Sequence, residues 1–67
     1  MSTYALWEVR NCRNLYRGTV ETRTLTGAKR RASLARMHAD SDLVIENGDG
    51  VQLSRKTGRT WTDEQYY

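Results

Sequence analysis

Residues 27–37, with the sequence GAKRRASLARM, concentrate cationic and hydroxyl side chains that could bind an anion. These side chains are Lys29, Arg30, Arg31, Ser33 and Arg36. Arginine and lysine neutralise phosphate or carboxylate groups, and the planar guanidinium can make two parallel hydrogen bonds to either one. Leu34 and Met37 lie among them, and an apolar pair beside cations favours a protein surface as the partner. The chemistry predicted for this stretch is binding.

Catalytic and metal chemistry lack the residues that they need. His38 is the only histidine and Cys12 the only cysteine, so a zinc site with the usual ligand spacing cannot be assembled. A serine nucleophile needs a nearby base, and no spacing in the chain brings a serine to His38. The acids in DSD (40–42) and NGDG (47–50) lack the order of a calcium-binding loop and its closing glutamate. We therefore predict a protein that is not an enzyme and holds no metal or cofactor.

The alanines of the same region predict the helix that positions its cations. Ala28, Ala32, Ala35 and Ala39 recur at spacings of four, three and four residues, which is one face of an α-helix. We expect this helix from about residue 27 to 38, with Thr26 as its N-cap. Its alanine face should pack closely on a sheet.

The opposite face of this helix is expected to point away from the core. At about 100° per residue, Arg30, Leu34 and Met37 form an outer ridge. The residues beside this ridge are Lys29, Ser33 and Arg36 on one flank and Arg31 on the other. A solvated helix is the simpler interpretation of a charged face. However, no acid lies in the segment to pair with its bases, and Leu34 and Met37 would be exposed together, so we favour a partner-binding helix.

Period-two alternation and turn residues predict five strands around the helix. They are residues 3–11, 19–24, 41–47, 51–56 and 59–62. The expected architecture is an α+β fold with a single helix packed on a curled antiparallel five-stranded sheet, in the order β-β-α-β-β-β. We expect one small domain over residues 1–67, with a frayed tail at DEQYY.

The alternation of apolar and polar residues does not identify the buried face equally well in every strand. Residues 4–6 are apolar on both sides of the first strand, so the core face is open there. Beyond Leu6 we expect Trp7 and Val9 inside, with Glu8 and Arg10 in solvent. In the fourth strand we expect Val51 and Leu53 inside, with Gln52 and Ser54 on the other side, and we assign Trp61 to the core.

Charge and cysteine usage limit the classes of protein. The formal net charge is +3 and the sequence pI about 9.4. Eight basic residues lie between positions 10 and 36 against the single acid Glu21, an asymmetry that suggests an acidic partner. One cysteine excludes an internal disulfide, and no secretory leader or apolar run near 20 residues is present. We expect a monomeric cytoplasmic protein without membrane contact.

Four short motifs resemble a known family. They are WEVRN (7–11), RGT (17–19), LTGAKRRAS (25–33) and GRTWTD (58–63). In this order they are similar to the small phage-encoded anti-CRISPR proteins that inhibit the type I-F surveillance complex, specifically the ninth family of that group. The likeness is collinear from Tyr4 to Asp63.

This resemblance implies a helix on a five-stranded antiparallel sheet and an inhibitory function in an infected bacterial cell. Family members bind the repeated backbone subunits of the RNA-guided complex and obstruct pairing of target DNA with the guide RNA. Two basic family positions fall on Lys29 and Arg30, whereas a third falls on Leu34, so Arg31 or Arg36 would have to compensate. The chain also has one residue fewer between Gly18 and Thr24, so the targeted subtype could differ.

The residues alone are also compatible with other partners. A stand-alone small basic nucleic-acid-binding module is the main alternative, and nonspecific contact with duplex DNA is compatible with both functions. Self-association through Leu34 and Met37 is a third. In the first hairpin, Tyr16 with Arg13 and Arg17 forms a second candidate surface.

Overall fold

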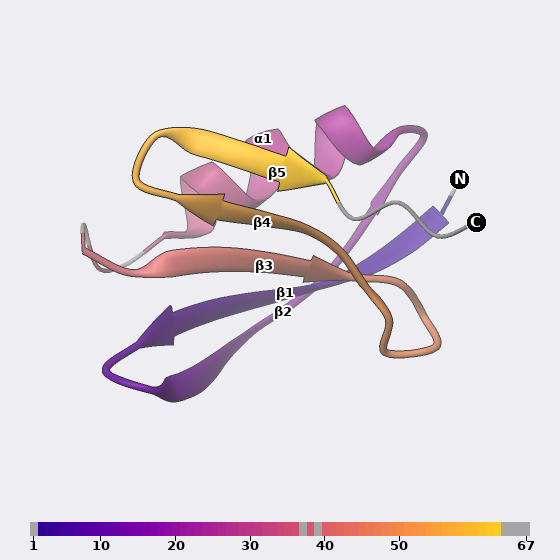
Figure 1. The fold of residues 1–67 in the computed structure, drawn as a ribbon. Coiled ribbons are helices and arrows are strands. Elements are labelled where there is room, and N and C mark those ends of the chain that lie inside the picture. Colours follow the sequence, from indigo (N-terminus) through magenta and orange to yellow (C-terminus); the bar gives the residue numbers. More distant parts are fainter. Residues whose placement is uncertain (1, 37, 39, 64–67) are drawn as a thin grey trace.

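The computed structural model describes residues 2–36, 38 and 40–63, which form one helix and one sheet (Figure 1). The elements are β1 (Ser2–Arg10), β2 (Arg13–Thr22), α1 (Leu25–Ala35), β3 (Asp42–Glu46), β4 (Gln52–Thr57) and β5 (Thr60–Asp63). The strands pair antiparallel in the spatial order β2-β1-β3-β4-β5. The predicted α+β class and the order β-β-α-β-β-β are confirmed. In the described part of the chain, no helix has the length and apolar character to cross a lipid bilayer.

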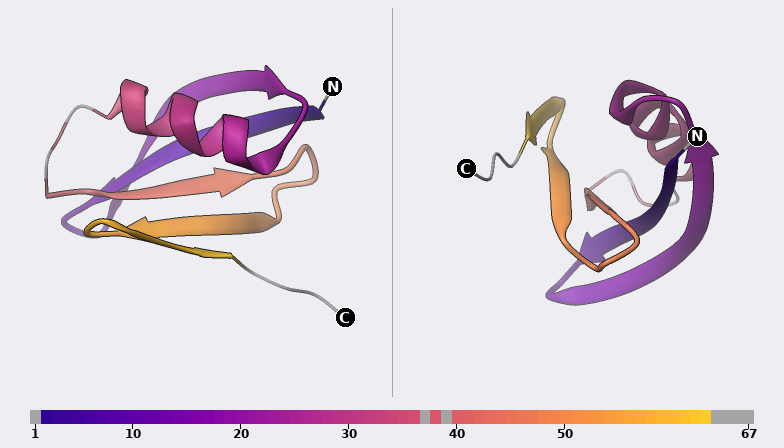
Figure 2. Two further views of the ribbon diagram at one scale, coloured as in Figure 1. Left: turned by 90° about the horizontal axis from the view of Figure 1, so that it is seen from above. Right: turned by 90° about the vertical axis from the view of Figure 1, so that its right-hand side faces the viewer.

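The sheet curls around its helix without closing (Figure 2). α1 lies on the concave side against β1, β2 and β3. β4 and β5 continue the curve on the other side, so that β5 comes to lie opposite α1 (Figure 2, right). This curvature brings a C-terminal strand next to a helix that lies about 30 residues earlier in the chain.

The core fills the concave side of the sheet. Its strand residues are Tyr4, Leu6, Leu43 and Ile45, with Val20, Leu25, Leu53 and Trp61 packed around them. From the helix, Ala28 and Ala32 are buried, as the alanine spacing predicts, while Ala35 is only partly buried. Ala39 lies outside the described residues. Alanine side chains allow the axis of α1 to lie close to the strands.

The core face of β1 beyond Leu6 is the opposite of our prediction. Tyr4 and Leu6 face the helix, and strict alternation then places Glu8 inside with 0% of its surface exposed. Trp7 and Val9 face outward on the convex side of the sheet. Arg10, expected in solvent, is half-exposed and its Nε lies 3.0 Å from Asp40 Oδ1.

Glu8 is tolerated in the core because its carboxylate is paired and hydrogen-bonded. Its Oε1 accepts from Arg17 Nε at 3.0 Å, and its Oε2 accepts from the His38 backbone N–H at 2.7 Å and from Ser41 Oγ at 2.6 Å. Arg17 reaches it from a bulge, since Leu6 pairs with Gly18 and Trp7 with Tyr16, which leaves Arg17 as the extra residue. One carboxylate thus joins β1 to β2 and to the segment after α1.

The first turn and the helix start also differ from the predicted boundaries. β2 begins at Arg13, because Asn11 and Cys12, with φ of 53° and 62°, turn the chain in two residues. The N-cap of α1 is Thr24, whose Oγ1 accepts from the Gly27 N–H at 3.1 Å, and not Thr26. A Cβ at Gly27 would lie 3.2 Å from Thr22 Cβ, so glycine lets the first turn of α1 approach β2.

The helix ends at Ala35, three residues before the predicted end. Arg36 takes an extended conformation, with ψ of 127°. Its guanidinium donates to the His38 carbonyl at 2.9 Å and to the Ser41 carbonyl at 2.6 Å. These bonds turn the chain toward β3 in place of another helical turn.

The inward face of β4 differs from prediction because of a second bulge. Ile45 pairs with Ser54 and Glu46 with Gln52, so Leu53 is the extra residue and still packs against the core. Ser54 is therefore fully buried, and its Oγ donates to Asp63 Oδ1 at 2.7 Å. Val51, expected inside, is exposed.

Candidate partner-binding surface

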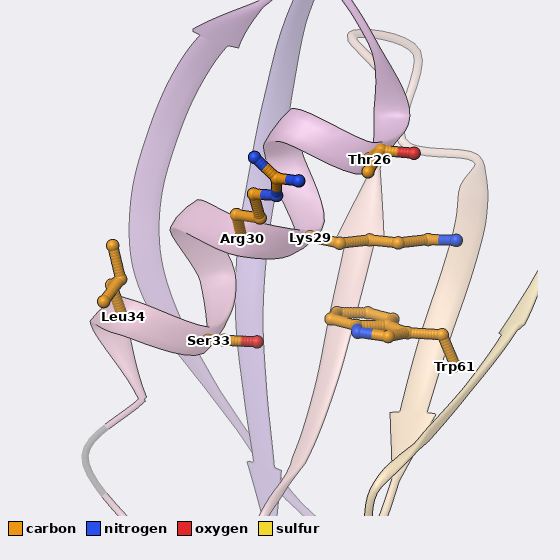
Figure 3. Close-up of a pocket in the computed structure, with 6 residues that line it drawn as sticks. All are labelled: Thr26, Lys29, Arg30, Ser33, Leu34 and Trp61. Atoms are coloured by element: carbon orange, nitrogen blue, oxygen red, sulfur yellow. The ribbon is translucent and has the colours of Figure 1, made fainter.

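α1 presents Arg30, Arg31, Ser33 and Leu34 to solvent. All four are exposed, and Leu34 is 84% exposed although it is a large aliphatic residue. The prediction that Arg30 and Leu34 point away from the sheet is confirmed (Figure 3). Met37, the third member of the predicted ridge, lies outside the described residues. A cationic helix surface next to an exposed leucine is thus present, and we call these four residues the helix face.

Arg30 and Arg31 carry the uncompensated charge of this surface. Neither guanidinium makes an ion pair with any residue that the structure describes. Both are on the outer side of α1, where a partner can reach them without displacing an internal contact. Their charges are therefore available for binding.

Lys29 does not share this freedom. Its Nζ lies 2.7 Å from Asp63 Oδ1 in β5, and its side chain is only 18% exposed. The prediction that all the helix bases lack acidic partners is therefore wrong for Lys29, because the curled sheet supplies a carboxylate from the other end of the chain. Arg36, bonded to two backbone carbonyls, likewise supports the fold.

The Lys29–Asp63 pair holds β5 against α1. The hydrogen bond from Lys29, with a second from Ser54, lowers the pKa of the Asp63 carboxyl below its ordinary value. Asp63 therefore stays ionised to a lower pH than an ordinary aspartate does. The pair fixes the distance between the helix and the last strand.

A groove of about 550 Å³ opens between α1 and β5 (Figure 3). Its lining residues are Thr26, Lys29, Arg30, Ser33, Leu34 and Trp61. The Nζ atoms of Lys29 and Lys56 each lie 5.8 Å from the centroid of the Trp61 ring. Lys56 Nζ is also 3.4 Å from Ser33 Oγ. The groove therefore combines aliphatic and aromatic walls with ammonium groups.

Three residues of this region were missed by sequence reasoning. The sequence predicts a helix cap at Thr26, a core residue at Trp61 and an ordinary strand position at Lys56. Local sequence carries no signal for their meeting, since the strand pairing places Lys56 opposite Trp61 and the curl of the sheet then brings both to α1. Only the tertiary structure brings the three residues together.

The second candidate surface, around the first hairpin, is not a single site. Tyr16 is exposed on the convex face and packs on Trp7, with ring centroids 5.0 Å apart at 59°. Arg17 points to the opposite side, toward Glu8, and Arg13 lines a hollow with Arg10 and His38. The three residues predicted to form this surface therefore lie on different parts of the molecule.

No model of a known protein family matches the chain, and no curated protein matches it significantly. Within the described residues, no three His, Cys, Asp or Glu side chains group as metal ligands would. The geometry of the helix face and the motifs of the sequence are therefore the features that indicate a function.

Proposed function

We propose that the protein is a non-enzymatic inhibitor of a type I CRISPR RNA-guided surveillance complex. In this function it docks on the backbone subunits through α1 and blocks pairing of target DNA with the guide RNA. The observation that supports the proposal best is the helix face, where Arg30 and Arg31 lie beside the exposed Leu34 and have no ion-pair partner among the described residues. The four motifs that resemble the ninth type I-F anti-CRISPR family support it from the sequence.

The proposed mechanism is steric and electrostatic. The described chain measures 30 × 24 × 20 Å, large enough to occupy the path of a nucleic-acid strand and small enough to fit between protein subunits. Arginines on its outer face steer it toward acidic surface and fix its orientation there. Because the backbone subunits repeat, several copies can bind one complex.

The structure alters which residues should carry the docking. Arg30 and Arg31 supply free charge, Leu34 an apolar contact and Ser33 a hydroxyl. Lys29 contributes indirectly, because its ammonium is engaged by Asp63. Arg31 is the candidate to replace the basic family position that falls on Leu34, since Arg36 is bonded to the backbone.

Reversing both free charges tests this proposal. Arg30→Glu with Arg31→Glu should weaken co-elution with a purified type I surveillance complex about a thousandfold, since two interface arginines at about 2 kcal/mol each give about 4 kcal/mol. Thermal unfolding by calorimetry should be unchanged, because both side chains are exposed. Lys29→Glu is a poorer test, because it places a second carboxylate against Asp63.

A matched control makes the same charge change elsewhere. Arg13 and Arg59 are exposed at the β1–β2 and β4–β5 turns, and their double substitution by Glu should leave co-elution intact. If the Arg30/Arg31 variant binds the complex as tightly as the parent, the helix face is not the docking surface.

Gel shifts with free duplex and single strands at about 150 mM salt distinguish the proposed inhibitor from a stand-alone nucleic-acid-binding module. Such binding should fall with salt, with a slope of log affinity near −1.8 for two phosphate contacts on duplex DNA. The exposed Leu34 beside Arg30 and Arg31 favours a protein partner over a phosphate backbone.

A further inference from the structure

We propose that the groove between α1 and β5 takes one large apolar side chain from an acidic segment of the partner. The partner residue would insert beside Trp61 while carboxylates on either side of it meet the cations at the rim. This inference deepens the proposed function and rests on it only for the identity of the partner.

The walls of the groove select an apolar anchor. They consist of the Trp61 indole, the Leu34 side chain and the aliphatic stems of Lys29 and Arg30 (Figure 3). A volume of about 550 Å³ lies within the roughly 300–1,000 Å³ of sites that hold whole small molecules. One anchor residue and parts of its neighbours therefore fit. Leu34 borders the groove and is 84% exposed, so an occupant can cover part of its surface.

The charges around the groove select acidic neighbours for that anchor. Lys29, Arg30 and Lys56 place three cations at or beside it, and Asp63 is the one carboxylate of the described residues that pairs with any of them. Among residues 2–36, 38 and 40–63, neither Arg30 nor Lys56 has a carboxylate partner. Carboxylates of an incoming segment would supply that missing charge without breaking an existing ion pair.

A second copy of the chain is a poor occupant by the same reasoning. A two-fold dimer buries the same patch of both chains, so it would bring Arg30 and Arg31 near their own copies. Such like-charge contacts oppose association. The occupant with complementary charge is an acidic segment of a different protein.

Three synthetic peptides separate the apolar from the ionic requirement by NMR titration of the labelled protein. The probe is acetyl-Glu-Glu-Phe-Glu-Glu-amide. The first control replaces Phe by Ser at equal charge, and the second replaces each Glu by Lys around the same Phe. The probe should shift the amides of Thr26 and Ser33 and the indole N–H of Trp61, and both controls should bind at least tenfold more weakly.

Two variants that each introduce a Phe without changing the charge test the groove itself. Ser33→Phe fills it from an exposed helix position, whereas Thr62→Phe adds the same ring to the other face of β5, because Trp61 alternates with Thr62 along the strand. Ser33→Phe should reduce both peptide binding and affinity for the surveillance complex at least tenfold. Thr62→Phe should preserve both.

The outcomes distinguish this inference from the proposed function. Equal binding of the Phe and Ser peptides, or full complex affinity of Ser33→Phe while the Arg30/Arg31 variant loses it, overturns the groove assignment alone. Shifts of the same resonances with protein concentration, without peptide, would identify a second copy as occupant and also overturn it. If the protein binds no surveillance complex, the proposed function fails, and the peptide titration still decides the chemistry of the groove.

Discussion

Replacing Glu8 by Gln tests how far one buried carboxylate supports this fold. The substitution keeps the shape of the side chain and removes its charge. The Gln oxygen can still accept from the His38 N–H and Ser41 Oγ, which both bind Oε2 in the parent. The amide nitrogen then faces Arg17 Nε, which lies 3.0 Å from Oε1 in the parent. Two donors would meet in the interior.

The expected loss follows from these contacts. A hydrogen bond to a charged group contributes about 1.5–3 kcal/mol, and Arg17, with 23% of its side chain exposed, regains part of this from water. The bonds from His38 and Ser41 also weaken, because charge-assisted bonds are roughly twice as strong as neutral ones. We expect a total loss of about 3 kcal/mol. For a domain of this size that lowers Tm by about 20 °C.

Differential scanning calorimetry and urea unfolding of parent and variant measure this loss. Glu21→Gln is the matched control, since Glu21 is exposed on β2 and its substitution should change stability by less than about 0.5 kcal/mol. A loss for Glu8→Gln no larger than that of the control would refute the reasoning, because it would mean that the buried cluster adds no net stability.

Two further predictions concern the ends of α1 and β5. Thr24→Ala should lower the free energy of unfolding by about 1 kcal/mol by removing the N-cap acceptor, whereas Thr26→Ala should lower it by only a few tenths. Chemical denaturation followed by circular dichroism compares the two variants. If Thr26→Ala were the more destabilising, Thr26 and not Thr24 would be the N-cap. Asp63→Asn should destabilise the protein by about 0.5 kcal/mol at neutral pH, as an ion pair near the surface does. Because the folded-state pKa of Asp63 is lowered, this stabilisation is present above its unfolded value of about 3.9 and is lost as pH falls through the folded value. The difference between parent and variant in calorimetry should therefore disappear in acid, and a difference that persists there would contradict the assigned role of Lys29.

The helix and its two faces follow from the sequence because they depend on one short periodic signal. Alanines at helical spacing allow close packing on a sheet, and their direction determines where Arg30 and Leu34 point. Five strands follow from alternation and turn residues in the same local way. These features are decided within about ten residues, so the sequence shows them directly.

The errors arise where distant residues decide the outcome. From the local sequence, Glu8 is expected to face solvent. In the folded chain its carboxylate binds Arg17, which lies in a bulge, and Ser41, which lies in a loop 33 residues away. The local sequence likewise predicts no acidic partner for Lys29, whereas the curl of the sheet places Asp63 beside it. In both cases a charge is neutralised by tertiary structure, which no local pattern records. The groove beside Trp61 escaped prediction for the same reason.

The two tryptophans lie on opposite sides of the sheet, Trp7 beside Tyr16 on the convex side and Trp61 at the groove. The chain therefore carries one tryptophan fluorophore on each of the two surfaces. With Trp7→Phe or Trp61→Phe, a single tryptophan remains, and the quenching of its emission by acrylamide in the presence of a partner reports which side is covered. Tryptophan quenching can in this way report the orientation of the bound protein without any attached label.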